Sequence, residues 1–343
     1  EFKSMYADAG VPLRKVSLGG DEVPNGVWEK SPKIKQLMDS LSLPSVNAVW
    51  PYYVKKLQAL SEAKGIDMAG WEEFGMVNQG KGMQVNPALA GTSMQLDVWN
   101  NVIGGGQEDL AYKLANAGYK TVLISSTNYY FDMAWNTNFM EPGLKWATYA
   151  DLYHSYTLLP ENFFANIQLT KKGKELGAAY FQTKEKLTEK GESSLLGLKG
   201  GLWAETVQTG ARLDYMVFPR FLALAERAWS EKRSYEDDVA FDEAAFNADY
   251  HAFVQKVGND ELKKLGRTFS FRLPSVGLKE IDAKLFANAE YPGFAIYYTE
   301  DGSIPTLASN LYSEGISIDP SKVYTFVTLA ADGRASLPST FNK

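Results

Sequence analysis

The sequence of 343 residues contains no cysteine, which excludes disulfide bonds, thiolate nucleophiles and cysteine-ligated metals. Its two histidines, His154 and His251, are isolated, so neither a Ser-His-Asp triad nor a multi-histidine metal site is expected. No apolar run approaches the roughly 20 residues of a membrane-spanning helix. The net charge is −6 and Lys and Arg form no cluster, which argues against nucleic-acid binding. Any chemistry is therefore expected to rest on carboxylates.

Over its first two-thirds, the chain alternates short apolar runs with amphipathic segments. This order is typical of βα units and predicts a parallel sheet. The predicted strands are Lys15–Gly20, Asp67–Glu72, Gln95–Asn100, Thr121–Ser126 and Gly200–Ala204. The predicted helices are Pro44–Lys64, interrupted at Pro51, Glu108–Ala117 and Arg212–Trp229.

The pattern changes near Gly266, where short alternating strands are separated by Pro, Gly and Asp. This pattern predicts a small antiparallel sandwich. We therefore expect two domains, residues 1–266 and residues 267–343. The sandwich carries no clustered acid–aromatic pairs, so it is expected to pack beside the first domain without supplying catalytic groups.

The stretch "SLGGDEV" places Asp21 and Glu22 side by side after Gly19-Gly20, at the end of a predicted strand. Neighbouring side chains on a strand point to opposite faces, so two adjacent carboxylates share a pocket only where the backbone bends. The glycines supply the freedom to bend and leave room for a ligand. A solvated acidic turn is the alternative reading of these residues.

Four further strand ends pair an aromatic residue with an acid two positions away. Parallel α/β folds gather their sites at the carboxyl ends of strands. Flat rings beside carboxylates suit a sugar, because rings stack on C–H faces and acids accept hydroxyl hydrogen bonds. One such pair alone would indicate ordinary core packing, whereas four in succession favour a site. The pairs are Trp71 with Glu73, Asp97 with Trp99, Tyr130 with Asp132, and Trp203 with Glu205.

Together these motifs resemble family 20 glycoside hydrolases, the β-N-acetylhexosaminidases. "SLGGDEV" looks like that family's His-x-Gly-Gly-Asp-Glu signature, with Ser17 in place of the histidine. "GWEEF", "DVWNN", "YYFDM" and "GLWAE" follow in the family's order, and "YPGFAIYYTEDGSIPT" is similar to the sandwich that ends bacterial chitobiases. The resemblance implies an α/β fold: a (β/α)8 TIM barrel, with strands four to eight in this chain, followed by an immunoglobulin-like β-sandwich.

The resemblance also implies what lies outside these residues. Strands one to three, and the family's sugar-binding arginine, are expected in a preceding segment of the same protein. A periplasmic or secreted bacterial location is expected from the similarity to chitobiases.

The implied activity is exo-acting release of terminal N-acetylglucosamine from chitobiose or longer chitooligosaccharides, with retention of configuration. Glu22 would act as acid and base, and Asp21 would orient the substrate's 2-acetamido group, which attacks C1 and forms an oxazolinium intermediate. Tyr130 would donate to the acetamido oxygen. The other implied sugar contacts are the acceptors Asp132 and Glu205 and the wall residues Trp71, Trp99, Trp146 and Trp203. No metal or organic cofactor is implied.

Two other functions fit parts of the pattern. A barrel that keeps the aromatic pocket but has lost catalysis would be an N-acetyl-sugar-binding protein, and Ser17 would be a symptom of that loss. Asp21 and Glu22 could instead ligate a metal, although the sequence offers no nearby ligands. The intact acid pair favours the enzyme.

Overall fold

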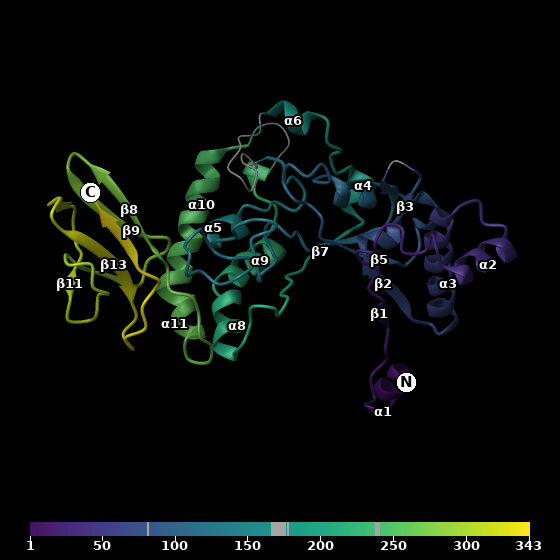
Figure 1. Ribbon diagram of the computed structural model, residues 1–343, viewed down its shortest axis with the longest axis horizontal. Coiled ribbons are helices and arrows are strands. Elements are labelled where there is room, and N and C mark those ends of the chain that lie inside the picture. The colour runs from purple at the N-terminus through teal and green to yellow at the C-terminus, as the bar shows by residue number, and fades with distance from the viewer. Residues whose placement is uncertain (81, 166–175, 177, 237–240) are drawn as a thin grey trace. The chain divides into compact units, whose positions relative to one another are not determined.

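The computed structural model describes residues 1–80, 82–165, 176, 178–236 and 241–343 (Figure 1). The chain divides into two units. The first contains Glu1–Thr127 and Leu159–Lys199, and the second contains Asn128–Leu158 and Gly200–Lys343.

A five-stranded parallel sheet forms the centre of the first unit, in the order β1-β2-β5-β6-β7. Strand order in space follows strand order along the chain, as in a sheet built from successive right-handed crossovers. Residues Met68 and Ala69 of β2 and Leu96 and Val98 of β5 are buried, as expected for parallel strands that are covered on both faces. The strands are β1 (Lys15–Ser17), β2 (Asp67–Trp71), β5 (Gln95–Val98), β6 (Lys120–Leu123) and β7 (Leu195–Leu198).

Four predicted strands are confirmed in position but end earlier than expected, and the fifth is wrong. The run "LLGLKGGLWAE" holds two apolar pieces separated by glycines, and the first piece, Leu195–Leu198, pairs with β6. The predicted strand Gly200–Ala204 makes only an isolated parallel bridge, between Gly201 and Tyr130 in the second unit.

Helices of the first unit connect these strands. α3 (Val49–Ala63) begins directly after a 3₁₀ turn and packs against β2. Pro51 lies in its first turn, where no backbone N–H is needed, so the predicted interruption is wrong. The remaining elements of this unit are α1 (Phe2–Asp8), α2 (Pro32–Leu41), α4 (Leu110–Ala117), α6 (Ala178–Gln182), α7 (Glu189–Glu192) and the hairpin β3 (Met76–Asn78) and β4 (Met83–Val85).

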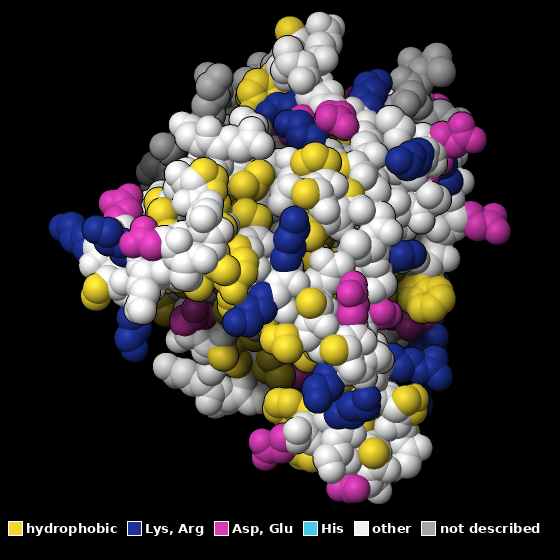
Figure 2. Space-filling model, turned by 90° about the vertical axis from the view of Figure 1, so that its right-hand side faces the viewer, with side chains coloured by type: hydrophobic (Ala, Val, Ile, Leu, Met, Phe, Trp, Pro, Cys, Tyr) yellow, Lys and Arg dark blue, Asp and Glu magenta, His cyan; other side chains and the backbone are white. Residues whose placement is uncertain are grey.

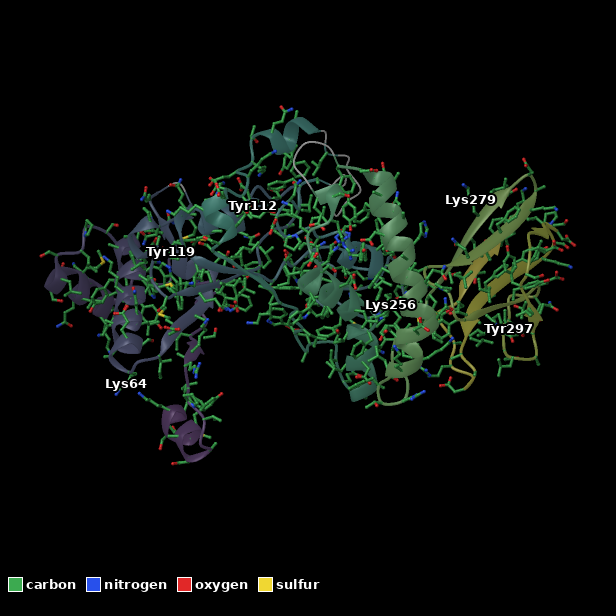
Figure 3. All side chains as sticks on the ribbon, turned by 180° about the vertical axis from the view of Figure 1, so that it is seen from behind. Lys64, Tyr112, Tyr119, Lys256, Lys279 and Tyr297 are labelled. Carbon is green, nitrogen blue, oxygen red and sulfur yellow. The ribbon has the colours of Figure 1, made fainter. Side chains whose placement is uncertain are left out.

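Two buried tyrosines fix α4 and the start of β6 (Figure 3). Tyr112 donates to the carbonyl of Pro160 at 2.8 Å, and Tyr119 donates to the carbonyl of Asn86. α4 ends at Gly118, which adopts the left-handed conformation with φ 102°, as the sequence predicted.

Several large apolar side chains of the first unit remain exposed, and Figure 2 shows hydrophobic surface between charged groups on one face of the molecule. Among the described residues, β1 forms ladder hydrogen bonds only with β2, so it is an edge of the sheet. The exposed apolar residues close to β1 in the sequence are Val11, Leu18, Val23 and Val27.

Helices of the second unit include α8 (Gly210–Val217) and α9 (Arg220–Trp229), which replace the single predicted helix Arg212–Trp229. Pro219 separates them because it cannot continue a helix from α8. The others are α5 (Leu152–Tyr156), α10 (Glu243–Lys256) and α11 (Leu262–Leu265).

The second unit ends in a sandwich of two antiparallel sheets, ordered β11-β10-β13-β14 and β12-β9-β8 (Figure 1). Leu285 of one sheet and Phe326 of the other are fully buried in a shared core. The predicted sandwich is confirmed. Its strands are β8 (Val276–Ile281), β9 (Lys284–Ala289), β10 (Ala295–Thr299), β11 (Asn310–Leu311), β12 (Ile316–Ser317), β13 (Val323–Leu329) and β14 (Ser339–Asn342).

Candidate active site

The Gly-Gly-Asp-Glu turn follows β1 and leaves the extended conformation at once. Gly19 and Gly20 have φ of 73° and 104°, and Glu22 has φ of 51°. A Cβ on Gly20 would lie 2.3 Å from the ring of Phe74, so a glycine is required there. The sharp bend brings Asp21 and Glu22 past the strand end, where both side chains are exposed. The alternation of side chains between the two faces of a strand therefore does not apply to Asp21 and Glu22.

Two acids, the buried Glu72 and the half-buried Glu73, lie in the 3₁₀ turn after β2. Glu73 Oε1 accepts the backbone N–H of Glu22 at 3.3 Å. The two side-chain oxygens of Glu72 accept the backbone N–H groups of Trp99 and Asn100 at 2.9 and 3.1 Å. The two acids thus hold the ends of two different strands.

Burial governs the protonation of this pair. Burial raises the pKa of Glu72 well above its usual value, and the charge of Glu73 adds to the rise. Burial also raises the pKa of Glu73, the N–H of Glu22 lowers it, and the charge of Asp21 raises it. These shifts place three carboxyl groups under mutual electrostatic influence beside Glu22.

A cavity of about 640 Å³ opens beside the acid turn within the first unit. Glu22 and Glu73 both line it, together with the loosely stacked rings of Trp28 and Trp50, whose centroids are 6.3 Å apart. Trp71 ends β2 and Trp99 follows β5, both half-buried. The first unit therefore holds four of the predicted site residues, namely Asp21, Glu22, Trp71 and Trp99.

Asp97, the acid that the sequence pairs with Trp99, is engaged elsewhere. It is 3% exposed, forms an ion pair with Lys199 Nζ at 2.5 Å, and accepts from Gln95 Nε2 at 3.0 Å. These contacts tie Asp97 to Lys199 and Gln95 within the first unit.

An aromatic cluster in the second unit gathers three more of the predicted residues. The bridge between Tyr130 and Gly201 places Tyr130 beside Trp203, with ring centroids 4.3 Å apart and planes inclined by 36°. Trp146 meets Tyr130 edge to face at 5.8 Å and is 40% exposed. Rings from three chain segments therefore meet, which suits a wall for a sugar.

Asp132 is the buried acid of this cluster. It is 1% exposed, and its Oδ1 atom has no hydrogen-bond partner among the described residues. The pKa of Asp132 is raised from the ordinary 3.8 to about 6: burial is the main cause and the charge of Glu205 adds to it, while backbone N–H groups and Arg220 act in the opposite direction. Glu205 itself is exposed. A buried carboxylate oxygen without a partner is a site where a hydroxyl donor is favoured.

The sequence analysis missed Arg220, which holds the loop that carries Tyr130 and Asp132. Arg220 is completely buried and lies over the ring of Trp135, 4.1 Å from its centroid. It donates to four backbone carbonyls, of Phe131 at 2.7 Å, Met133 and Ala150 at 2.8 Å, and Met216. A lone arginine in "FPRFL" carries no sequence signal for these distant partners.

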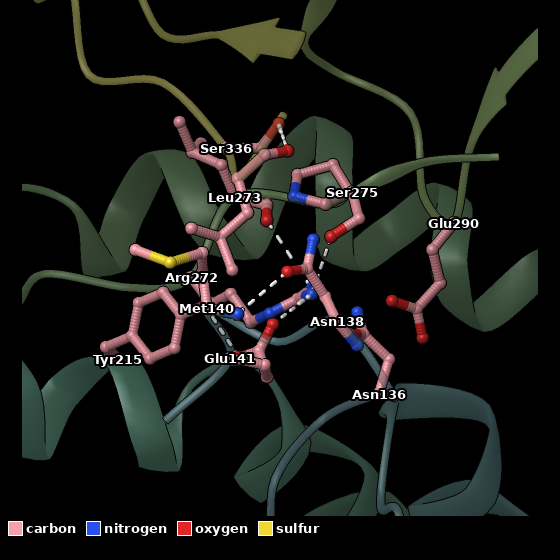
Figure 4. A network of polar contacts seen from close by, with 12 residues as sticks. Asn136, Asn138, Met140, Glu141, Tyr215, Arg272, Leu273, Ser275, Glu290 and Ser336 are labelled. Atoms are coloured by element: carbon pink, nitrogen blue, oxygen red, sulfur yellow. Dashed lines mark hydrogen bonds and ion pairs between the residues drawn. The ribbon is translucent and has the colours of Figure 1, made fainter. Parts of the chain in front are cut away.

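A second missed network joins the loop of Trp146 to the segment that precedes the sandwich (Figure 4). Arg272 and Glu141 are 2% and 4% exposed and form an ion pair at 3.2 Å. Tyr215 donates to Glu141 Oε1 at 2.7 Å, and Arg272 also donates to Ser275 Oγ at 2.7 Å. The predicted second domain thus contributes a buried charge to the loop beside the aromatic cluster.

In the described part of the chain, no group of three or more His, Cys, Asp or Glu side chains is arranged to hold a metal ion. The same residues contain no helix with the length and apolar character needed to cross a membrane.

Two protein-family models match this chain. The model of "Glycosyl hydrolase family 20, catalytic domain" matches residues 8–232. The chain belongs to glycosyl hydrolase family 20. The model of "Chitobiase/beta-hexosaminidase C-terminal domain" matches residues 274–340. The predicted fold class, a TIM-barrel catalytic domain followed by a β-domain, is confirmed.

Two curated relatives are similar over most of this family 20 chain. A beta-hexosaminidase of Vibrio vulnificus is 30% identical over 325 residues, and an N,N'-diacetylchitobiase of Vibrio harveyi is 27% identical over 346. Each alignment covers 88% of this chain but only 37% and 38% of the relatives. The chain therefore spans little more than a third of their length.

A solved structure shows the same fold. The family 20 exo beta-N-acetylglucosaminidase of Vibrio harveyi in complex with N-acetylglucosamine is 25% identical, with a TM-score of 0.53. The match covers 78% of this chain and 34% of that one.

Proposed function

We propose that the protein is an exo-acting β-N-acetylhexosaminidase that releases terminal N-acetylglucosamine from chitobiose and chitooligosaccharides. The observation that carries the proposal is the acid turn. Asp21 and Glu22 are adjacent, and the turn is held by Gly20 and by the Glu73 acceptor. Adjacent acids cannot flank a glycosidic bond from both sides, which favours substrate assistance over two separated carboxylates.

In the proposed reaction Glu22 gives its proton to the glycosidic oxygen while the bond from that oxygen to C1 breaks. The substrate's acetamido oxygen attacks C1 from the opposite face and forms the oxazolinium ion. Asp21 accepts the acetamido N–H and stabilises the positive charge that develops there. Glu22 then takes a proton from water, whose oxygen opens the ring at C1 and restores the original configuration.

The remaining residues are assigned to sugar recognition. Tyr130 donates to the acetamido oxygen, and Asp132 and Glu205 accept from distal hydroxyls. The unpartnered, buried Oδ1 of Asp132 supports this role. Four tryptophans are assigned to stacking on the sugar, Trp71 and Trp99 in the first unit and Trp146 and Trp203 in the second.

We further propose that polypeptide outside residues 1–343 supplies the other strands of the barrel, in the same protein. β1 is an edge among the described strands, and Leu18 and Val27 near it are exposed. A closed barrel has no edge strands. The further strands would therefore pair with β1 and cover such side chains.

The substrate test uses the full-length protein. A chromogenic β-N-acetylglucosaminide is expected to be cleaved, and the matching β-glucoside is expected to be inert, because only the former carries the acetamido nucleophile. Release of the chromophore gives the rate for both. Comparable turnover of the two sugars would contradict substrate assistance, and binding of N-acetylglucosamine without turnover would favour a sugar-binding protein.

The role of Asp132 predicts a pH dependence of sugar binding. With its pKa at about 6, Asp132 is ionised above that pH and protonated below it. The KM for an aryl N-acetylglucosaminide is expected to rise by about tenfold from pH 7 to pH 5, as the acceptor is lost. Asp132→Asn should give a high KM that no longer changes over this range. A constant KM in the unmodified protein would contradict the assignment.

A further inference from the structure

We propose that Glu73 is a positioning residue for the general acid: its carboxylate holds the backbone of Glu22 and so fixes where the Glu22 carboxyl group points. This inference rests on the proposed function. Its central contact is the hydrogen bond from the Glu22 N–H to Glu73 Oε1 at 3.3 Å. Both side chains line the same cavity of about 640 Å³.

Glu73 is itself rigidly placed, which is what a positioning residue requires. The indole N–H of Trp50 donates to the Glu73 carbonyl at 2.8 Å. The ring of the next residue, Phe74, is 1% exposed and fills the space that side chains on Gly20 and Gly70 would need. The 3₁₀ turn that carries Glu73 is therefore packed directly against the glycine that precedes the catalytic pair.

A second hydrogen bond joins the acid turn to the segment that precedes Glu73, and it is made by Gly19. The backbone N–H of Trp71 donates to the carbonyl of Gly19 at 3.0 Å. Both ends of the turn are thus hydrogen-bonded to the segment Trp71–Glu73. Gly19 bonds to the backbone of Trp71, and Glu22 bonds to the side chain of Glu73. The turn between them has little freedom to rotate while both bonds are present.

The conformation of Glu22 makes this restraint necessary. Its φ of 51° lies in the left-handed region, which is strained for a residue other than glycine and persists only when the surroundings impose it. A carboxylate acceptor makes a hydrogen bond about twice as strong as a neutral one. Without that acceptor, the backbone of Glu22 is free to relax to negative φ, which would turn its side chain away from the leaving oxygen.

Glu72 provides a comparison inside the same turn. It is also buried, but its oxygens bind the backbone of Trp99 and Asn100. Loss of Glu72 should therefore disturb the wall residue Trp99 and raise KM. Glu73 also interacts with the Trp99 side chain, so the effect that distinguishes the loss of Glu73 is a lower kcat where acid assistance matters.

The experiment compares Glu73→Ala, Glu73→Gln and Glu62→Ala in the full-length protein. Glu62 is an exposed acid on α3 whose contact is to Gln58 in the same helix, so it is the control for loss of a carboxylate. Glutamine keeps an oxygen that can accept the Glu22 N–H. The activity readout is kcat on a chitooligosaccharide, which has a poor leaving group, and on an activated aryl glycoside.

Glu73→Ala is expected to lower kcat on the oligosaccharide by about 100-fold, the effect of a misplaced catalytic group, and on the aryl glycoside by less than about tenfold, because an activated leaving group needs little acid assistance. Glu73→Gln should recover most of the loss. Equal losses on both substrates, or no recovery in Glu73→Gln, would overturn the proposal.

Amide hydrogen exchange of the peptide that contains Gly19 to Val23 gives a second readout that needs no turnover. Exchange should be faster in Glu73→Ala than in the unmodified protein and in Glu62→Ala. Unchanged exchange would overturn the proposal. If the unmodified protein hydrolyses no N-acetylglucosaminide, the proposed function fails, while the exchange rates still decide whether Glu73 holds the turn.

Discussion

Glu22→Gln in the full-length protein is expected to lose about 10²–10⁴-fold of its activity on chitooligosaccharides, the usual contribution of a general acid. The loss on activated aryl N-acetylglucosaminides should be much smaller. Asp21→Asn should slow both substrate types, because the acetamido group takes part in each. Measurement of kcat and KM for both variants on a series of leaving groups tests this division of roles.

Glu62→Gln is the control for this series. Glu62 is an exposed acid on α3 that contacts Gln58 in the same helix, and its substitution should leave the dependence on the leaving group unchanged. If Glu22→Gln and Asp21→Asn show the same leaving-group dependence, the two acids do not have the proposed separate roles.

Arg272→Met is expected to destabilise the protein by about 3–5 kcal/mol, because it leaves the Glu141 carboxylate buried without its ionic partner. The double variant Glu141→Met with Arg272→Met should recover much of this loss, since replacement of a whole buried ion pair by apolar side chains is often neutral. Urea unfolding of the full-length variants at neutral pH measures both effects.

Arg334→Met serves as the matched control. Arg334 pairs with Asp332 at 2.8 Å, and the two side chains are 40% and 56% exposed, so solvent screens this pair far more than the buried one and it contributes little. A loss in Arg272→Met no larger than that in Arg334→Met would contradict the importance of the buried pair. Truncation after Gly266 would also remove Arg272, so the pocket chemistry of a truncated protein is expected to suffer through the loop of Trp146, even though the sandwich is expected to supply no catalytic group.

Strand positions could be predicted because burial on both faces leaves a continuous apolar run in the sequence. "TVLIS" is an example, and its strand is confirmed as β6. The strand prediction was wrong at Gly200–Ala204 because two neighbouring apolar runs could each pair with β6. The sequence does not show which of the two runs pairs, because that depends on the reach of the connection that precedes them.

The sequence placed the candidate site residues after the ends of predicted strands, but it could not predict the directions of their side chains. The alternation of strand faces ends with the last ladder hydrogen bond, and Gly19, Gly20 and Glu22 all have positive φ beyond it. Buried ion pairs were missed for a related reason. Arg272 and Glu141 lie 131 positions apart, and the position of a charged residue in the sequence does not show which distant residue forms a buried ion pair with it.

The contact between Gly20 and Phe74 has a consequence for engineering. Any side chain at position 20 would enter the ring of Phe74, and φ at this position is 104°, so random substitution of position 20 alone should return almost only glycine among folded variants. Shortening the side chain at position 74 would relieve the clash but not the backbone strain. A library that aims to reshape the acid turn therefore has to vary residues 21 and 22 on a fixed Gly20–Phe74 pair, and at position 22 it should tolerate asparagine or glycine better than valine or isoleucine, whatever chemistry is selected.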